Sequence, residues 1–244
     1  NKKISLHEFL NFQTWVGGDR DGNPNVTYRI SKSAIISLSN HLVSMYNKDL
    51  NKLFNDYSIS VKHPHKNCRL HKSISKDLKK SKLPKKILSR YQFEPVRIKI
   101  LLIKEKLAFY RDSISQFRKP ELTLKSFQRD LKIISDFLEQ LSKDQSLIFG
   151  DFKKLLIRSK IFGLHFMGLD IRQHSSVHGK AANEIISFIY PKFNYLNASE
   201  SERCKVLKEL IKRDNINYDK EIKNRSKLLE EVLDTFSLMK NAMR

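Results

Sequence analysis

The sequence predicts an α/β fold that is predominantly helical. Through most of the 244-residue chain, apolar residues recur at three- and four-residue steps, which is the spacing of amphipathic helices. The segment at 163–173 instead alternates apolar and polar residues, and it predicts a β-strand. Seven glycines and six prolines, beside fifteen phenylalanines and eight tyrosines, exclude collagen-like and wholly disordered chains.

The first third of the chain contains one strongly predicted helix between two segments of a different kind. A loop with three glycines at 16–27 needs backbone freedom at several positions. A long amphipathic helix is expected at 28–54, with its apolar stripe facing a core. Residues 56–92 are rich in lysine and poor in periodicity, so we expect a variable, solvated loop there.

The remaining helices follow from the same periodicity. Pro95 suits the first turn of a helix, because its missing N–H would lack a partner there in any case. Further helices are expected at 94–117, 123–142, 147–160, 177–189, 199–213 and 225–240.

The chain is strongly basic, with 47 Lys+Arg against 26 Asp+Glu and a net charge of +21. Such a charge favours polyanion partners, but the basic residues are spread over the polar faces of predicted helices and no nucleic-acid motif is present. A basic helical module that binds nucleic acid, or a scaffold, therefore stays the alternative to an enzyme. No apolar stretch is long enough to span a membrane. Cys68 and Cys204 lie far apart, which favours a reducing cytoplasm over a disulfide framework.

Asp170 and Arg172 end the predicted strand and are the first candidate site. Residues two apart on a strand point the same way, about 7 Å apart at Cα. The pair is either an anion-binding arginine oriented by Asp170 or a structural ion pair at a strand end. His174 is a further candidate for this site, whereas His165 falls on the apolar face and is expected to be a core or packing histidine.

The glycine-rich loop is the second candidate. Asp19, Arg20, Asp21 and Asn23 lie among its glycines, in a pattern that matches neither a calcium loop nor a phosphate-binding loop. The loop either aims Arg20 at an anion or is a well-satisfied turn before a helix.

A third group contains metal-ligating residue types. Histidines and a cysteine lie close together in the lysine-rich segment, but their spacing matches no common zinc site, so a metal centre is disfavoured. The residues are His63, His65, Cys68 and His71.

Four segments together resemble one enzyme family. Residues 12–27 (FQTWVGGDRDGNPNVT) are similar to the signature FxSWxGGDRDGNPxVT, and residues 162–178 (FGLHFMGLDIRQHSSVH) to FGLxxxxLDIRQxSxxH. Residues 94–97 (EPVR) resemble EPYR, and residues 231–236 match EVLDTF. The chain therefore resembles phosphoenolpyruvate carboxylase of the bacterial and plant type, and the four similar segments occur in that family's order.

The resemblance implies an enzyme that joins bicarbonate to phosphoenolpyruvate, giving oxaloacetate and phosphate with Mg²⁺ or Mn²⁺. It implies a β/α barrel of the TIM type that includes the strand at 163–173. It also implies a homotetramer. From the residues themselves we expect a cytoplasmic protein with no membrane partner, and a nucleic-acid partner is disfavoured. Arg172 becomes an active-site arginine that contacts the substrate anion. Asp19, Arg20, Asp21, Asn23 and Asp170 are expected to bind substrate or to brace the site. The family commonly has Glu where this chain has His174, so no carboxylate role is inferred there.

Residues 1–244 are expected to form an internal part of such an enzyme. The family's TAHPTE segment with its catalytic histidine, its FHGRGG loop, its acidic metal ligands and its GYSDSxKD segment do not occur in the sequence. We therefore expect the ligands of the metal ion outside these residues, and no carboxylase activity from these residues alone.

Overall fold

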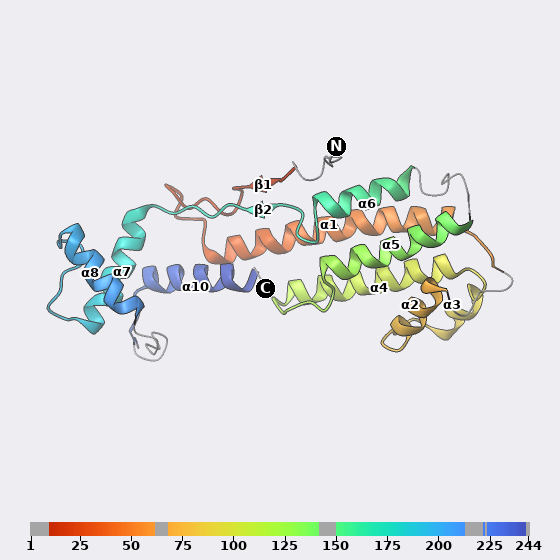
Figure 1. Cartoon of the computed structure of the whole chain (residues 1–244). Coiled ribbons are helices and arrows are strands. Elements are labelled where there is room, and N and C mark those ends of the chain that lie inside the picture. The colour runs from red at the N-terminus through yellow and green to blue at the C-terminus, as the bar shows by residue number, and fades with distance from the viewer. Residues whose placement is uncertain (1–9, 62–67, 142–149, 213–221, 223, 243–244) are drawn as a thin grey trace, which may run out of the picture. The chain divides into compact units, whose positions relative to one another are not determined.

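The computed structural model of the chain describes residues 10–61, 68–141, 150–212, 222 and 224–242. It confirms a mostly helical chain, and the described residues include two short parallel strands (Figure 1). These strands, β1 (Gln13–Thr14) and β2 (Gly168–Leu169), pair with each other, and Gly168 N donates to Phe12 O at 3.0 Å. The described residues do not themselves form a closed barrel.

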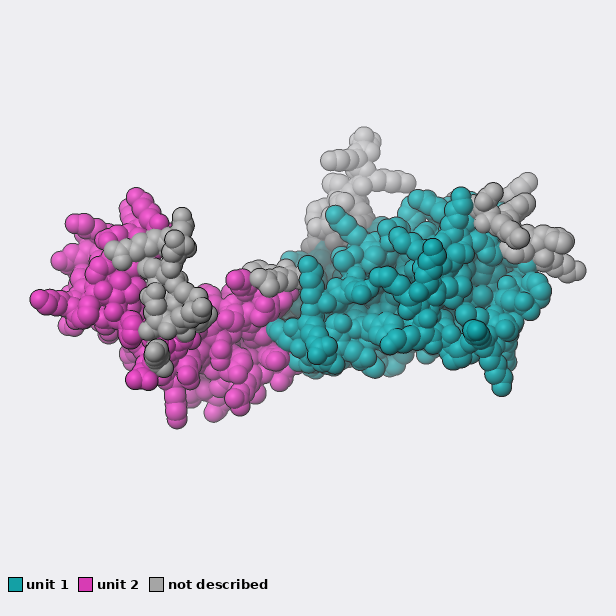
Figure 2. Space-filling model, turned by 90° about the horizontal axis from the view of Figure 1, so that it is seen from below, with its two compact units in different colours: residues 1–14, 35–168 teal, residues 15–34, 169–244 magenta. Residues whose placement is uncertain are grey.

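The chain folds as two compact units, which Figure 2 distinguishes by colour. Unit 1 comprises Asn1–Thr14 and Ile35–Gly168, and unit 2 comprises Trp15–Ala34 and Leu169–Arg244. None of the described helices combines the length and the apolar character that crossing a bilayer requires.

Unit 1 is built from three long helices and three short ones among the described residues, and the structure confirms the predicted ones. Pro95 opens its helix in the first turn, as expected. The helices are α1 (Tyr28–Asp56, of which residues 28–34 belong to unit 2), α2 (Arg69–Leu78), α3 (Lys85–Arg90), α4 (Pro95–Ser115), α5 (Leu124–Leu141) and α6 (Asp151–Ile161).

The core of unit 1 reaches the segment that leads to β2. Tyr46 of α1 is fully buried against Phe127 of α5, with ring centroids 5.0 Å apart. Its hydroxyl donates to the carbonyl of Gly163 at 2.7 Å, and the hydroxyl of Tyr110 donates to the carbonyl of Leu164 at 2.8 Å. Two buried tyrosines therefore anchor the backbone just before the strand.

The prediction of a loop at 56–92 is wrong, because the segment contains α2 and α3. Leu70 and Ile74 lie one helical turn apart on α2 and are 1% and 5% exposed in the core. Leu70, Ile74 and Leu78 recur at four-residue steps, so the helical spacing is present in the sequence, but the stripe is short and lies among lysines. Tertiary burial of this narrow stripe decides the helix.

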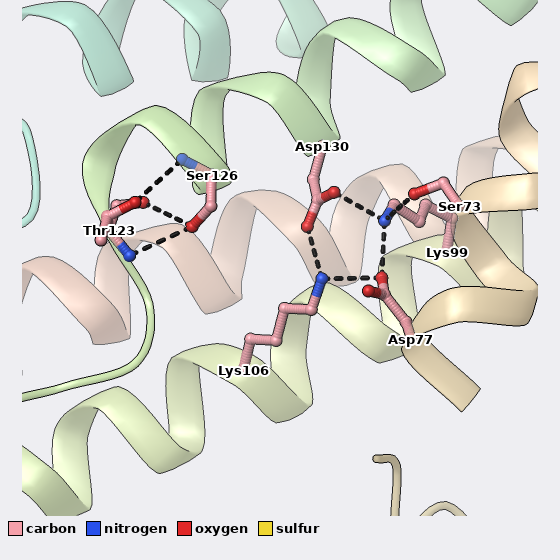
Figure 3. Close-up of polar contacts among 7 residues, drawn as sticks. All are labelled: Ser73, Asp77, Lys99, Lys106, Thr123, Ser126 and Asp130. Atoms are coloured by element: carbon pink, nitrogen blue, oxygen red, sulfur yellow. Dashed lines mark hydrogen bonds and ion pairs between the residues drawn. The ribbon is translucent and has the colours of Figure 1, made fainter. Parts of the chain in front are cut away.

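Lys99 of α4 is fully buried and lies in a network of ionic contacts within unit 1 (Figure 3). Its Nζ donates to Asp77 and Asp130, both at 2.7 Å, and to the hydroxyl of Ser73 at 2.8 Å. Lys106, one side of which reaches solvent, donates to the same two carboxylates at 2.7 Å. The network joins α2, α4 and α5.

The strand predicted at 163–173 is much shorter in the structure. Gly163 (φ 58°) and Phe166 (φ 73°) adopt the left-handed conformation, which turns the backbone instead of extending it. Extended pairing is therefore confined to Gly168–Leu169 and to an isolated bridge at Arg172.

Among the described residues, unit 2 has fewer helices than unit 1 and a smaller core. Its helices are α7 (Ser175–Ile189), α8 (Glu200–Ile211) and α10 (Lys227–Ala242), at the predicted positions, together with the first turns of α1. Ala181, Leu229 and Val232 are buried in a cluster with Ile222. Ser199 and Glu202 form a reciprocal capping box that starts α8.

Candidate anion-binding site

The structure pairs the two candidate segments of unit 2 through their backbones. Arg172 N donates to Gly18 O at 3.0 Å, and Arg20 N donates to Arg172 O at 3.0 Å. This is a parallel bridge between Asp19 and Arg172. The glycine-rich loop and the strand end, far apart in the sequence, therefore form one local structure.

Two glycines make this close approach sterically feasible. A Cβ on Gly18 would lie 2.2 Å from the carbonyl oxygen of Asp170, so a side chain there would force the pairing apart. Gly17 has a φ of +81°, and a Cβ on it would lie 2.8 Å from the Cβ of Ala34. The loop therefore requires glycine at both positions for different reasons, close approach at Gly18 and conformation at Gly17.

The guanidinium of Arg172 is held by Asp170 and faces solvent. Its Nε and Nη2 donate to Oδ2 of Asp170 at 2.9 and 2.7 Å, and its side chain is 59% exposed. Its Nη1 makes no hydrogen bond or ion pair with a described residue. The hydrogen bond to Asp170 raises the pKa of Arg172 above its ordinary value, and the charge of Asp19 adds to this shift. The site therefore offers a guanidinium that stays charged and that Asp170 holds in one orientation.

Arg20 points the other way, into unit 2. It is 6% exposed, and its Nη2 donates to Ser31 Oγ at 2.8 Å. Its Nε lies 4.0 Å from Oε1 of Glu231. Burial lowers the pKa of Arg20, and the carboxylate of Glu231 opposes this shift. The geometry therefore favours a bracing role for Arg20 over direct contact with an anion in solvent.

The polar residues of the loop stiffen it by local hydrogen bonds. Oδ1 of Asp19 accepts from the backbone N of Asp21 at 3.1 Å, and Oδ1 of Asn23 accepts from the backbone N of Asn25 at 3.1 Å. Asn23 N also donates to Arg20 O at 3.2 Å. Side chains that bond their own backbone two residues on favour a single turn conformation. The side chains of Asp21 and Asn23 are exposed.

His174 and His165, which flank the predicted strand, lie in different surroundings. His174 is the N-cap of α7, where its Nδ1 accepts from Ser176 N at 3.2 Å, so its ring caps a helix and makes no hydrogen bond with Arg172. His165 is exposed, which contradicts the expected core position. His63 and His65 lie outside the described residues. Cys68 and Cys204 are free thiols.

Two residues of this site, Ser31 and Glu231, are not marked as site residues by their sequence context. Ser31 lies in the first turn of a helix, where small polar residues are common. Glu231 opens the EVLDTF segment, and that motif was the available signal that the region matters. Their contacts with Arg20 appear only when α1 and α10 are placed in space.

The family model for phosphoenolpyruvate carboxylase matches residues 1–244. The chain belongs to this family. The resemblance of its four motif segments to the family is thereby confirmed.

Curated relatives carry the same description. The chain is 26% identical to the phosphoenolpyruvate carboxylase of Rhodothermus marinus over 208 residues, which cover 84% of this chain and 22% of the relative. It is 27% identical to that of Prochlorococcus marinus subsp. pastoris (98% of this chain, 26% of the relative) and 30% identical to that of Thermosynechococcus vestitus (85% and 22%). The chain thus spans about a quarter of the length of these relatives.

Proposed function

We propose that the chain forms part of a phosphoenolpyruvate carboxylase, which joins bicarbonate to phosphoenolpyruvate to give oxaloacetate and phosphate. Family membership supports the reaction. The single observation that supports the site is the exposed guanidinium of Arg172, set on a backbone that the glycine-rich loop holds in register. In this proposal Arg172 binds an anionic group of the substrate.

The chemistry of the reaction calls for a donor of this kind. Phosphoenolpyruvate carries a phosphate and a carboxylate, and bicarbonate adds a further negative charge. A guanidinium can donate two parallel hydrogen bonds to such an oxyanion, and it stays charged at every physiological pH. Because Asp170 fixes one side of the fork, the remaining donors of Arg172 are already oriented when the anion arrives.

The other candidate residues brace this arginine. Asp19 lies opposite Arg172 in the backbone bridge, to which Arg20 donates one hydrogen bond, and Asp21 and Asn23 close the turns on which that bridge depends. We propose no direct substrate contact for Arg20, since its side chain is buried.

The finer fold and assembly are also proposals. The parallel pairing of β1 with β2, and of Asp19 with Arg172, is what two neighbouring strands of a TIM-type β/α barrel would provide. We propose that the whole protein contains this barrel and assembles as a homotetramer in the cytoplasm, as the family resemblance implies.

The family also implies Mg²⁺ or Mn²⁺. Among the described residues, no group of three or more His, Cys, Asp or Glu side chains is arranged to hold a metal ion. These residues therefore do not fit a metal centre, and we derive no step of the reaction through one.

Replacing Arg172 with alanine in the intact protein tests the proposal. Removing one oriented donor to an oxyanion lowers turnover by about 10²–10³-fold, so kcat/KM for phosphoenolpyruvate should fall by that factor. The melting temperature should barely change, because the side chain is exposed. Oxaloacetate formation and thermal unfolding are measured side by side.

Arg111→Ala is the matched control. Arg111 is also an exposed arginine, 54% accessible, that pairs with a neighbouring aspartate. If Arg172→Ala retains the same kcat/KM as Arg111→Ala, Arg172 is not a substrate ligand and the proposed site is wrong.

A further inference from the structure

Glu231 contacts two separate parts of the loop structure that carries Arg172. It lies on α10, and its Oε1 is 4.0 Å from Nε of the buried Arg20. The same oxygen accepts a hydrogen bond from the backbone N of Tyr28, the first residue of α1. One carboxylate thus joins α10, the glycine-rich loop and the start of α1, all within unit 2.

Each of these contacts places a negative charge beside a group that it stabilises. The side chain of Arg20 is 4% exposed, and its Nε has no hydrogen-bond partner among the described residues, so its charge depends on a nearby carboxylate. The first turn of α1 contains no acidic residue, and an anion at a helix N-terminus is stabilising. Glu231 supplies the negative charge in both places.

Ser31 completes the connection between α1 and the loop. Its Oγ accepts from Nη2 of Arg20 at 2.8 Å and donates to the carbonyl of Gly17 at 2.6 Å. Since Ser31 is itself fully buried, these bonds are shielded from competing water. Arg20 is therefore held from one side by Glu231 and from the other by Ser31.

Arg20 transmits this restraint to Arg172 through the backbone. The N–H of Arg20 donates to the carbonyl of Arg172 at 3.0 Å, and Gly18, two residues before it, accepts from Arg172 N at 3.0 Å. A shift of Arg20 would break the first bond and loosen the second. The Arg172 backbone has these two bonds as its link to the loop among the described residues.

We propose that Glu231 is a positioning residue for Arg172, which it holds in place through the buried Arg20 and the N-terminus of α1. The inference rests on the proposed function, since it assumes that Arg172 binds the substrate anion. Glu231 itself touches no reacting atom in this scheme. Its effect is on how well Arg172 is oriented before substrate binds.

The test uses Glu231→Gln in the intact protein. Glutamine retains a carbonyl oxygen that can accept from Tyr28 N, but it removes the charge that faces Arg20. We expect KM for phosphoenolpyruvate to rise about tenfold, because the buried charge of Arg20 loses its ion-pair partner. Glu231→Asp, which restores the charge on a shorter side chain, should recover part of the affinity. Glu230→Gln is the control, because Glu230 is the exposed neighbour on the same helix.

A double-mutant cycle separates positioning from simple stabilisation. If Glu231 acts through Arg172, Glu231→Gln should cost much less in an Arg172→Lys background than in the wild type. If Glu231 only stabilises the fold, it lowers the melting temperature and the cost in affinity is equal in both backgrounds. That second result overturns the inference.

Ser31→Ala provides a second route if Glu231→Gln does not fold. It releases Arg20 from Gly17 while leaving every charge in place, and it should raise KM in the same direction. An unchanged KM in folded Ser31→Ala overturns the inference. A normal kcat/KM in Arg172→Ala would instead overturn the proposed function. A loss in Arg172→Ala with none in Glu231→Gln or Ser31→Ala leaves the function and removes the positioning role.

Discussion

The two units each contain a cation held by aspartate, but in opposite surroundings. In unit 1, Lys99 is fully buried and donates to Asp77 and Asp130 at 2.7 Å. In unit 2, Arg172 donates to Asp170 at a similar 2.7 Å, yet 59% of its side chain and 37% of that of Asp170 are exposed. The distances alone would make these pairs look equivalent.

Burial distinguishes the pair that stabilises the fold from the pair that we propose to bind substrate. Lys99 has all three of its donors directed at Ser73, Asp77 and Asp130, so it has none left for a ligand. Arg172 has an unused terminal nitrogen and contact with solvent. A buried cation whose donors all have partners within the protein contributes to the fold. An exposed cation that still has donors without a protein partner is available to bind an anion.

The largest effect on stability is expected for Lys99→Met. The substitution keeps the volume of the side chain but leaves Asp130, 4% exposed, with Lys106 as its remaining cation. Removing one partner of a buried ion network should lower the free energy of unfolding by about 3–5 kcal/mol. Urea unfolding measures this free energy. Lys132→Met, at a position that is 72% exposed, should change it by less than about 1 kcal/mol. Equal effects would show that the network has no special role.

Asp77→Asn should have the next largest effect, and it should depend on pH. Burial raises the pKa of Asp77, but the hydrogen bonds from Lys106 and Lys99 outweigh burial, so the pKa lies below its ordinary value of 3.8. The charged form is therefore favoured by folding, and its stabilisation is present above pH 3.8 and is lost as the pH falls through the lower, folded-state pKa.

At pH 7 we expect Asp77→Asn to lower the free energy of unfolding by about 1.5–3 kcal/mol, since it weakens hydrogen bonds to two charged lysines. The gap between the variant and the wild type should narrow as the pH falls below 3.8. Unfolding curves at several pH values measure this gap. If the difference in unfolding free energy between the variant and the wild type stays constant as the pH falls, the charged form of Asp77 does not stabilise the fold.

Gly18→Ala tests the close approach in unit 2. The added Cβ would lie 2.2 Å from the carbonyl oxygen of Asp170, so the pairing must open. We expect a loss of about 1–3 kcal/mol in the free energy of unfolding, together with a fall in carboxylase turnover because Arg172 moves. Gly179→Ala, in the interior of α7 with its nearest neighbour 3.7 Å away, should be neutral or stabilising. A harmless Gly18→Ala would contradict the observed pairing.

The smallest effect on stability is expected for Asp170→Asn. The Arg172–Asp170 pair is exposed, and such pairs contribute about 0–1 kcal/mol, less at high salt. Substrate affinity should nonetheless fall, because Asp170 orients the guanidinium. The melting temperature and KM for phosphoenolpyruvate are compared in one protein preparation. A large loss of stability would show that burial does not distinguish the two pairs.

The amino-acid sequence by itself determined the long helices α1, α4 and α5, because apolar residues recur at three- and four-residue steps over many turns. It also determined the family, since the motif around Arg172 and the glycine-rich motif are long runs of specific residues.

Tertiary structure decided the rest. The few apolar residues of α2 are buried only because α2 packs against the core of unit 1. Gly163 and Phe166 adopt the left-handed conformation, and these local turns shorten the strand. The inward direction of Arg20 depends on Ser31 and on Glu231, which lies far along the chain. Contacts between residues so distant in sequence depend on chain packing, and a local pattern does not encode them.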